Sequence, residues 1–239
     1  MSVLSEAANA RVTAHSRDTT SSARGDPYDR SVIRAVLFDF GGVILSSPFE
    51  AFESYEREAG LQPGTIRSIN STHPHTNAWA RLERAEVSLA EFQELFEAEA
   101  AQLGHEVSGA EVIACLRGEI RPAMVAAIRQ LRDDYATGLL TNNFLTGTPE
   151  WSSGGSFAEL VDLFDVVVES SMIGFRKPET EFYEIALERI GVGADEAVFL
   201  DDLGINLKPA RAMGMTTIKV ADPDDALAQL ATVLGTTFS

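Results

Sequence analysis

Four short groups of polar residues each follow an apolar, strand-like segment, and their functional groups suit phosphate chemistry. In the first group, Asp39 is followed by Gly41 and Gly42, which places a carboxylate on a tight turn that a ligand can approach closely. A carboxylate can attack phosphorus and form an aspartyl phosphate. Taken alone, the same residues also fit an Asp–Gly turn that merely ends a strand.

The second and third groups supply a hydroxyl, an amide and an ammonium group. Thr141 could donate a hydrogen bond to a phosphate oxygen, and Asn142 could position the substrate or the nucleophile. Lys177 precedes Pro178, which fits the first turn of a helix beginning near Glu179. At a helix entrance, a lysine and the first backbone amides could neutralise phosphate oxygens. Each group alone also fits a simple strand-to-loop cap or a solvated lysine.

The fourth group is a pair of acids, Asp201 and Asp202, directly after the apolar run 197–200. Two adjacent carboxylates at the end of a buried strand are costly unless a cation pairs with them. Magnesium, held by one or two carboxylates together with water and phosphate, is the natural partner. A solvent-facing turn that caps a helix starting near Gly204 is the alternative. We favour the metal site because Asp39 occupies the matching position after another strand.

The elements around these groups predict an α/β fold with a Rossmann-like, three-layer parallel sheet. Apolar runs alternate with helical patterns in the second half of the chain, which is typical of βα units. The expected strands are 32–38, 136–140, 164–168, 197–200 and 216–220, and the helices that accompany them are 122–132, 179–190, 205–213 and 226–234. In open α/β sheets ligands bind at the carboxyl ends of the strands, so the four groups are expected to meet at one edge.

The first expected strand differs from the others because a long helical stretch separates it from the next one. A βα connection needs only a few loop residues. The excess therefore predicts an inserted helical cap at 46–119, with the core domain formed by 31–45 and 120–239. Residues 1–30 are rich in Ser, Thr, Ala and Arg, which is typical of a disordered tail. A second segment rich in Gly, Ser and Pro, 146–156, is expected to be a loop.

Several conspicuous residues of the insertion are interpreted as structural. His73 and His75 fit a loop before a helix better than a substrate contact. The aromatic residues fit helix packing, and the acidic run fits a solvated helix face. The aromatic residues are Trp79, Phe92 and Phe96, and the acids are Glu91, Glu94, Glu97 and Glu99.

Composition limits the possible partners and compartments. The 239-residue chain has a formal net charge of −17, which argues against nucleic acid and anionic membranes as partners. A phosphorylated substrate would therefore need local cations. The single cysteine, Cys115, excludes an internal disulfide and suits a reducing compartment, so we expect a cytoplasmic location. No apolar run approaches the roughly 20 residues of a membrane span, and the sequence does not indicate an oligomeric state.

Together, the four groups resemble the four motifs of the haloacid dehalogenase superfamily, in the same order and with an insertion after the first. The stretch 198–211 is similar to the phosphatase-like domains of soluble epoxide hydrolases and of some acyl-CoA dehydrogenases. The resemblance implies that Asp39 is the nucleophile, that Thr141 binds phosphate and that Lys177 orients both. It also implies a magnesium ion held by Asp202, with Asp201 beside it.

One position departs from the family pattern. Family phosphatases usually carry a second Asp two positions after the nucleophile, where this chain has Gly41. The metal ligand there is a backbone carbonyl, which glycine retains, whereas the general acid is the missing side chain. Loss of a positioned acid typically forfeits about 10²–10⁴ in rate.

The resulting expectation is a magnesium-dependent hydrolase of small phosphate monoesters that works through an aspartyl phosphate and turns over slowly. Two alternatives stay open. A degenerate site could bind a phosphate compound or a protein without turnover, because losing the acid weakens chemistry more than binding. A 2-haloacid dehalogenase would not need an acid at Gly41, but it would have little use for the pair Asp201 and Asp202.

Overall fold

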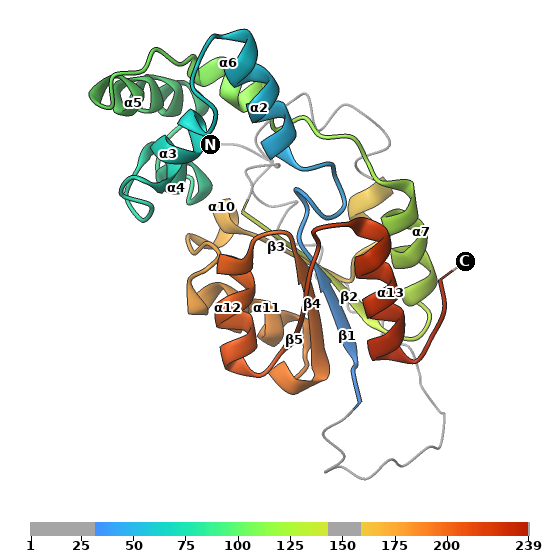
Figure 1. Ribbon diagram of the computed structural model, residues 1–239. Coiled ribbons are helices and arrows are strands. Elements are labelled where there is room, and N and C mark those ends of the chain that lie inside the picture. Colours follow the sequence, from blue (N-terminus) through green and yellow to red (C-terminus); the bar gives the residue numbers. More distant parts are fainter. Residues whose placement is uncertain (1–31, 143–158, 239) are drawn as a thin grey trace, which may run out of the picture. The chain divides into compact units, whose positions relative to one another are not determined.

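The computed structural model describes residues 32–142 and 159–238. The expected tail 1–30 and the expected loop 146–156 lie outside the described residues. Five parallel strands form one sheet in the order β3-β2-β1-β4-β5 (Figure 1), which confirms the predicted α/β class. The strands are β1 (Ala35–Phe38), β2 (Ala136–Thr141), β3 (Val166–Glu169), β4 (Ala197–Asp201) and β5 (Thr216–Lys219).

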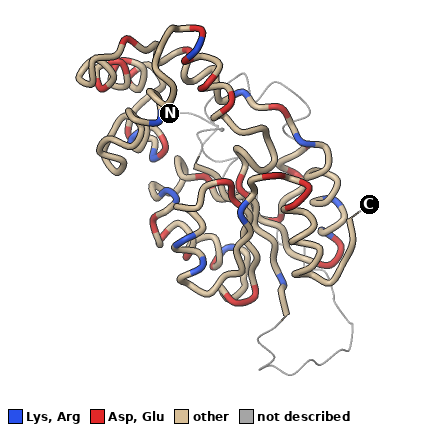
Figure 2. The backbone as a smooth tube through the Cα atoms, viewed as in Figure 1, with Lys and Arg blue, Asp and Glu red and all other residues tan. Residues whose placement is uncertain are grey.

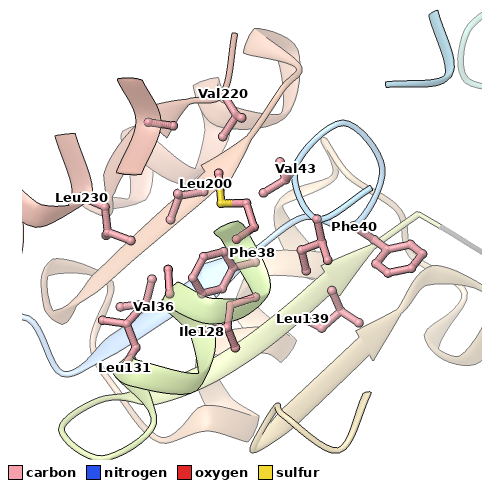
Figure 3. Packing of buried hydrophobic residues seen from close by; sticks show 14 of the residues in the cluster. Val36, Phe38, Phe40, Val43, Ile128, Leu131, Leu139, Leu200, Val220 and Leu230 are labelled. Carbon is pink, nitrogen blue, oxygen red and sulfur yellow. The ribbon is translucent and has the colours of Figure 1, made fainter. Parts of the chain in front are cut away.

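Helices cover both faces of this sheet, which explains why its central strands are continuous apolar runs. All four residues of β1 are fully buried. Helices α7 (Pro122–Leu131) and α13 (Pro223–Leu234) pack on one face, where Phe38 lies at the centre of a large apolar cluster (Figure 3). Helices α11 (Thr180–Ile190) and α12 (Gly204–Met213) pack on the other face.

Five helices lie between β1 and α7 in the chain, within the range expected for the insertion. They are α2 (Pro48–Glu58), α3 (Thr65–Ser71), α4 (Ala78–Glu83), α5 (Leu89–Gln102) and α6 (Gly109–Ala114). These inserted helices share an apolar cluster separate from the two clusters of the sheet. Trp79 lies 5.2 Å from Phe92 and 6.4 Å from Phe96 between ring centroids, as expected for helix packing.

Glutamate carboxylates bind the N-termini of several inserted helices. Glu56 accepts hydrogen bonds from the backbone at the start of α3, Glu99 from Ala78 at the start of α4, and Glu97 from Gly109 at the start of α6. The expectation that Glu97 and Glu99 merely form a solvated face was incomplete. Each satisfies an amide that a helix leaves unpaired at its first turn.

Some element boundaries differ from the predicted ones. Helix α11 begins at Thr180, one residue later than expected, and Pro178 precedes it instead of occupying its first turn. A short helix, α10 (Ser170–Ile173), and a 3-10 turn at Ala194–Glu196 were not predicted, because such short elements carry no measurable periodicity. Within the described residues, no helix is long and apolar enough to cross a membrane.

Candidate active site

The carboxyl ends of three neighbouring strands bring the predicted residues together around one lysine. The Nζ atom of Lys177 lies 2.7 Å from an oxygen of Asp39 and 2.8 Å from an oxygen of Asp201. It also donates to the Leu140 carbonyl at the end of β2, at 2.9 Å. Lys177 is only 1% exposed, and its ammonium group also lies over the Phe199 ring, 5.4 Å from the centroid.

Strand register accounts for this convergence. Strands β1 and β4 are adjacent and parallel, with Phe38 opposite Leu200, and the Asp39 amide donates to the Leu200 carbonyl at 2.9 Å. The residues that follow the two strands therefore stand side by side. This is the edge of an open α/β sheet at which ligands bind.

The site holds more negative than positive charge. Carboxylate oxygens of Asp39, Asp201 and Asp202 all lie within 4.8 Å of one another, and among them lies the single ammonium of Lys177. Burial raises the pKa of Asp39 well above its ordinary value, although Lys177 opposes the shift. Burial alone would lower the pKa of Lys177, but Asp201 and Asp39 outweigh it, so the pKa is raised.

The two acids of the fourth group have different surroundings. Asp201 is fully buried, and its oxygens accept hydrogen bonds from the Leu203 amide, from Asn206 and from Lys177. Asp202 is half-buried, and burial together with Asp201 raises its pKa to about 6. A cation beside Asp202 would relieve this repulsion. An all-oxygen donor set with excess negative charge fits magnesium, and Asp202 suits it better than Asp201.

The two glycines that follow Asp39 meet different constraints. Gly42 has a φ of +75°, and a Cβ atom there would overlap the Asp202 carboxylate, so the turn and the acid both require glycine. Its carbonyl accepts a 2.7 Å hydrogen bond from Arg121. At Gly41, a Cβ atom would meet nothing within 4 Å. Steric constraint therefore does not explain why position 41 lacks the Asp of the family pattern, since there is room for a side chain.

The second group of the motif set lies beside the lysine. Thr141 is the last residue of β2 and is buried. The Asn142 side chain brackets the Lys177 peptide: its Nδ2 donates to the Lys177 carbonyl at 2.8 Å and its Oδ1 accepts from the Lys177 amide at 2.7 Å. The Asn142 side chain is therefore engaged with the Lys177 backbone. The contact with substrate that we expected of Asn142 would have to come from the Asn142 backbone amide.

Sequence reasoning did not select three residues that contact these groups. Asn206, in the first turn of α12, donates to Asp201 from five residues further along the chain, a spacing that could have been noticed. Arg121 reaches Gly42 from the start of α7. Glu83, at the end of α4, approaches the Asn142 amide at 3.5 Å. Neither Arg121 nor Glu83 has a local sequence signal, because each comes from a distant segment.

Comparison with known proteins agrees with this geometry. Residues 33–214 match the model of the haloacid dehalogenase-like hydrolase family, and the chain belongs to that family. It is 36% identical to mouse acyl-CoA dehydrogenase family member 10 over 84% of this chain and 19% of that protein. It is 32% identical to mouse bifunctional epoxide hydrolase 2 over 86% of this chain and 40% of that protein. The chain thus spans well under half of these two relatives.

A smaller relative and two solved structures match this chain over most of its length and over most of their own. Sesquiterpene phosphatase astK of Aspergillus oryzae is 28% identical over 86% of this chain and 98% of that protein. A predicted HAD-like hydrolase from Porphyromonas gingivalis superposes with a TM-score of 0.61 at 23% identity, over 85% and 98% of the two chains. A HAD family enzyme from Bacteroides thetaiotaomicron, in complex with magnesium and inorganic phosphate, gives 0.52 at 22%, over 78% and 93%. These structures establish the fold.

Proposed function

We propose that this chain is a magnesium-dependent phosphatase of small phosphate monoesters. The observation that carries the proposal is the buried lysine bonded to two carboxylates, with a third carboxylate alongside. This arrangement can hold one anion and one divalent cation next to a nucleophilic oxygen. Phosphatases among the relatives, and magnesium with phosphate in a structural neighbour, support the same proposal.

In the proposed reaction, an Asp39 oxygen attacks phosphorus and the bond to the leaving alcohol oxygen breaks, which gives an aspartyl phosphate. Lys177 fixes Asp39 and offers positive charge to the phosphoryl oxygens, while the Thr141 hydroxyl donates to one of them. Asp39, Asp202 and the Gly41 carbonyl would hold magnesium, which when bound offsets the negative charge of the phosphate. Water then hydrolyses the acyl phosphate. The leaving oxygen takes its proton from water, because Gly41 offers none.

The inserted helices serve in this proposal as a cap over the site, and the substrate is a small phosphorylated molecule. Arg176 and Glu83 join the lysine-bearing loop to the end of α4, and Ser170 donates to the Glu83 carbonyl at 2.6 Å. These contacts support a cap that lies against the segment carrying Lys177. A cap in this position would select substrates and exclude water.

The test is phosphate release from p-nitrophenyl phosphate by the full chain, with magnesium and after chelation. We expect turnover that requires magnesium and is abolished in Asp39→Asn. Asp133→Asn removes an exposed acid after α7 and is the matched control, with activity equal to the parent. A chain with no magnesium-dependent turnover, or an Asp39→Asn variant as active as the parent, would refute the proposal.

The absent side chain at Gly41 favours one competing function, a site that binds phosphate compounds without turnover. Beryllium fluoride with magnesium mimics an aspartyl phosphate and should bind in both cases. Multiple turnovers of p-nitrophenyl phosphate would occur only in the enzyme. Binding of beryllium fluoride without any release of phosphate would favour the binding module.

A further inference from the structure

A cap carboxylate is linked to the catalytic lysine through side chains that sequence reasoning did not connect. Glu83, the last residue of α4, forms an ion pair with Arg176, the residue before Lys177. The same carboxylate receives the Trp79 indole N–H at 3.1 Å and approaches the Asn142 amide nitrogen at 3.5 Å. The Glu83 and Arg176 side chains are only 9% and 14% exposed.

The link continues to the nucleophile without a gap. The Asn142 amide bonds both the N–H and the carbonyl of Lys177, which fixes the peptide from which the lysine side chain extends. The lysine ammonium then lies 2.7 Å from Asp39. Two routes therefore link Glu83 to the Lys177 backbone, each through a single side chain: one through Arg176, the residue before Lys177, and one through Asn142.

Attachment of the inserted helices alone does not require a buried charge at Glu83. Its backbone carbonyl is already held by Ser170, and the neighbouring Arg84 forms a second ion pair, at 3.2 Å with Glu179. Desolvating a buried ion pair offsets much of its attraction, so such a pair is weak evidence of a stabilising role. It does fix the orientation of the groups that it joins.

We propose that Glu83 is a positioning residue which, through Arg176 and Asn142, sets the place of Lys177 beside the nucleophile. The inference rests on the proposed phosphatase function for its kinetic consequence. It means that the inserted helices contribute to the chemical step, beyond any contact that they make with substrate. It also gives Asn142 a role in holding the lysine.

The kinetic test compares Glu83→Gln with Arg84→Gln. Each change introduces a neutral glutamine and removes one ion pair between α4 and the segment around Lys177, but Arg84 bonds Glu86, Glu179 and the His75 carbonyl instead of Asn142. We expect Glu83→Gln to lower kcat for p-nitrophenyl phosphate about 10- to 100-fold with a far smaller change in KM. Arg84→Gln should keep kcat within about twofold of the parent. Equal kcat losses in both variants would overturn the proposal.

Two further measurements separate positioning from misfolding and from a failed function assignment. The double variant Arg176→Gln with Glu83→Gln should have a kcat no lower than that of the poorer single variant, because the two residues act through the same series of contacts. Fully additive losses of kcat would contradict this. In proton–nitrogen correlation spectra, the Asn142 side-chain amide should shift in Glu83→Gln but not in Arg84→Gln, because Asn142 contacts Glu83 while the Arg84 partner Glu179 accepts from the Arg176 backbone amide. This readout needs no turnover. Unchanged signals would overturn the proposal even for a chain without phosphatase activity, whereas shifted signals in an inactive chain would refute only the phosphatase.

Discussion

At the scale of single residues, the structure requires glycine at position 42 but leaves room for a side chain at position 41. Gly42 adopts a left-handed φ, and its missing side chain leaves room for Asp202. Gly41 has open space where a side chain would stand. Glycine at position 41 therefore affects the chemistry of the site, while glycine at position 42 is a steric requirement.

Replacing Gly41 by Asp should raise turnover. A carboxyl group there could protonate the leaving oxygen, and a positioned acid is worth about 10²–10⁴ in rate. We expect kcat to rise by about 10²-fold for phosphate esters of simple alcohols, whose leaving groups need a proton. The gain for p-nitrophenyl phosphate should be smaller. Phosphate release from both ester types measures the difference.

Gly41→Asn is the matched control, because it has nearly the same size but no proton that an acid could give. It should leave turnover near the parent value for both esters. If Asn and Asp at position 41 gave equal rates, the acid would not be what this site lacks.

At the scale of elements, carboxylates hold the inserted helices to one another. Glu56 of α2 is buried and accepts two 2.7 Å hydrogen bonds, from the amides of Gly64 and Ile66 at the start of α3. The positive end of a helix stabilises such a carboxylate. The many acidic residues of this segment (Figure 2) thus include some with a structural task.

Glu56→Gln should destabilise the chain by about 1–3 kcal/mol, because an amide NH₂ would face one backbone donor and leave it unpaired in a buried place. Urea unfolding followed by circular dichroism measures the loss. Glu53→Gln changes an exposed residue of the same helix and should stay within about 0.5 kcal/mol of the parent. Equal stability of the two variants would mean that the Glu56 bonds add nothing.

Sequence patterns predicted the parts of this fold that depend on local composition. The strands were visible because burial on both faces demands apolar runs, and Asp39, Lys177 and Asp202 were visible because reactive groups followed such runs. The Glu83–Arg176 pair was not, since 93 positions separate its members and only tertiary packing joins them. Asp201 was expected to help bind metal, and its burial among hydrogen-bond donors could be known only from the structure.

At the scale of the whole molecule, a strongly acidic chain gathers three of its carboxylates, those of Asp39, Asp201 and Asp202, in one site. Burial, together with the neighbouring Asp201, raises the pKa of Asp202 to about 6, which means that ionised Asp202 is unfavourable in the folded, metal-free state. Functional sites are often kept at the expense of stability. Magnesium bound at these carboxylates would offset their charge in the folded state. Magnesium binding should therefore increase the free energy of unfolding.

Two shifts in unfolding are therefore expected. In chelator at neutral pH, the free energy of unfolding of Asp202→Asn should be about 1–2 kcal/mol larger than that of the parent. The variant no longer buries a charge beside Asp201, and a pKa unit is worth about 1.4 kcal/mol. In magnesium at about one hundred times its dissociation constant, the parent should gain about 2.7 kcal/mol. Asp202→Asn should lose this response, because a neutral amide is a poor magnesium ligand.

Ionic strength must be matched with sodium chloride, since a chain of net charge −17 gains some stability from any salt through screening. Glu53→Gln removes one exposed negative charge and tests whether net charge alone explains the effect; it should keep the full magnesium response. A parent protein that magnesium does not stabilise beyond the sodium control would contradict a metal site at Asp39 and Asp202. A metal-free Asp202→Asn variant no more stable than the parent would show that Lys177 and Arg121 already balance these carboxylates.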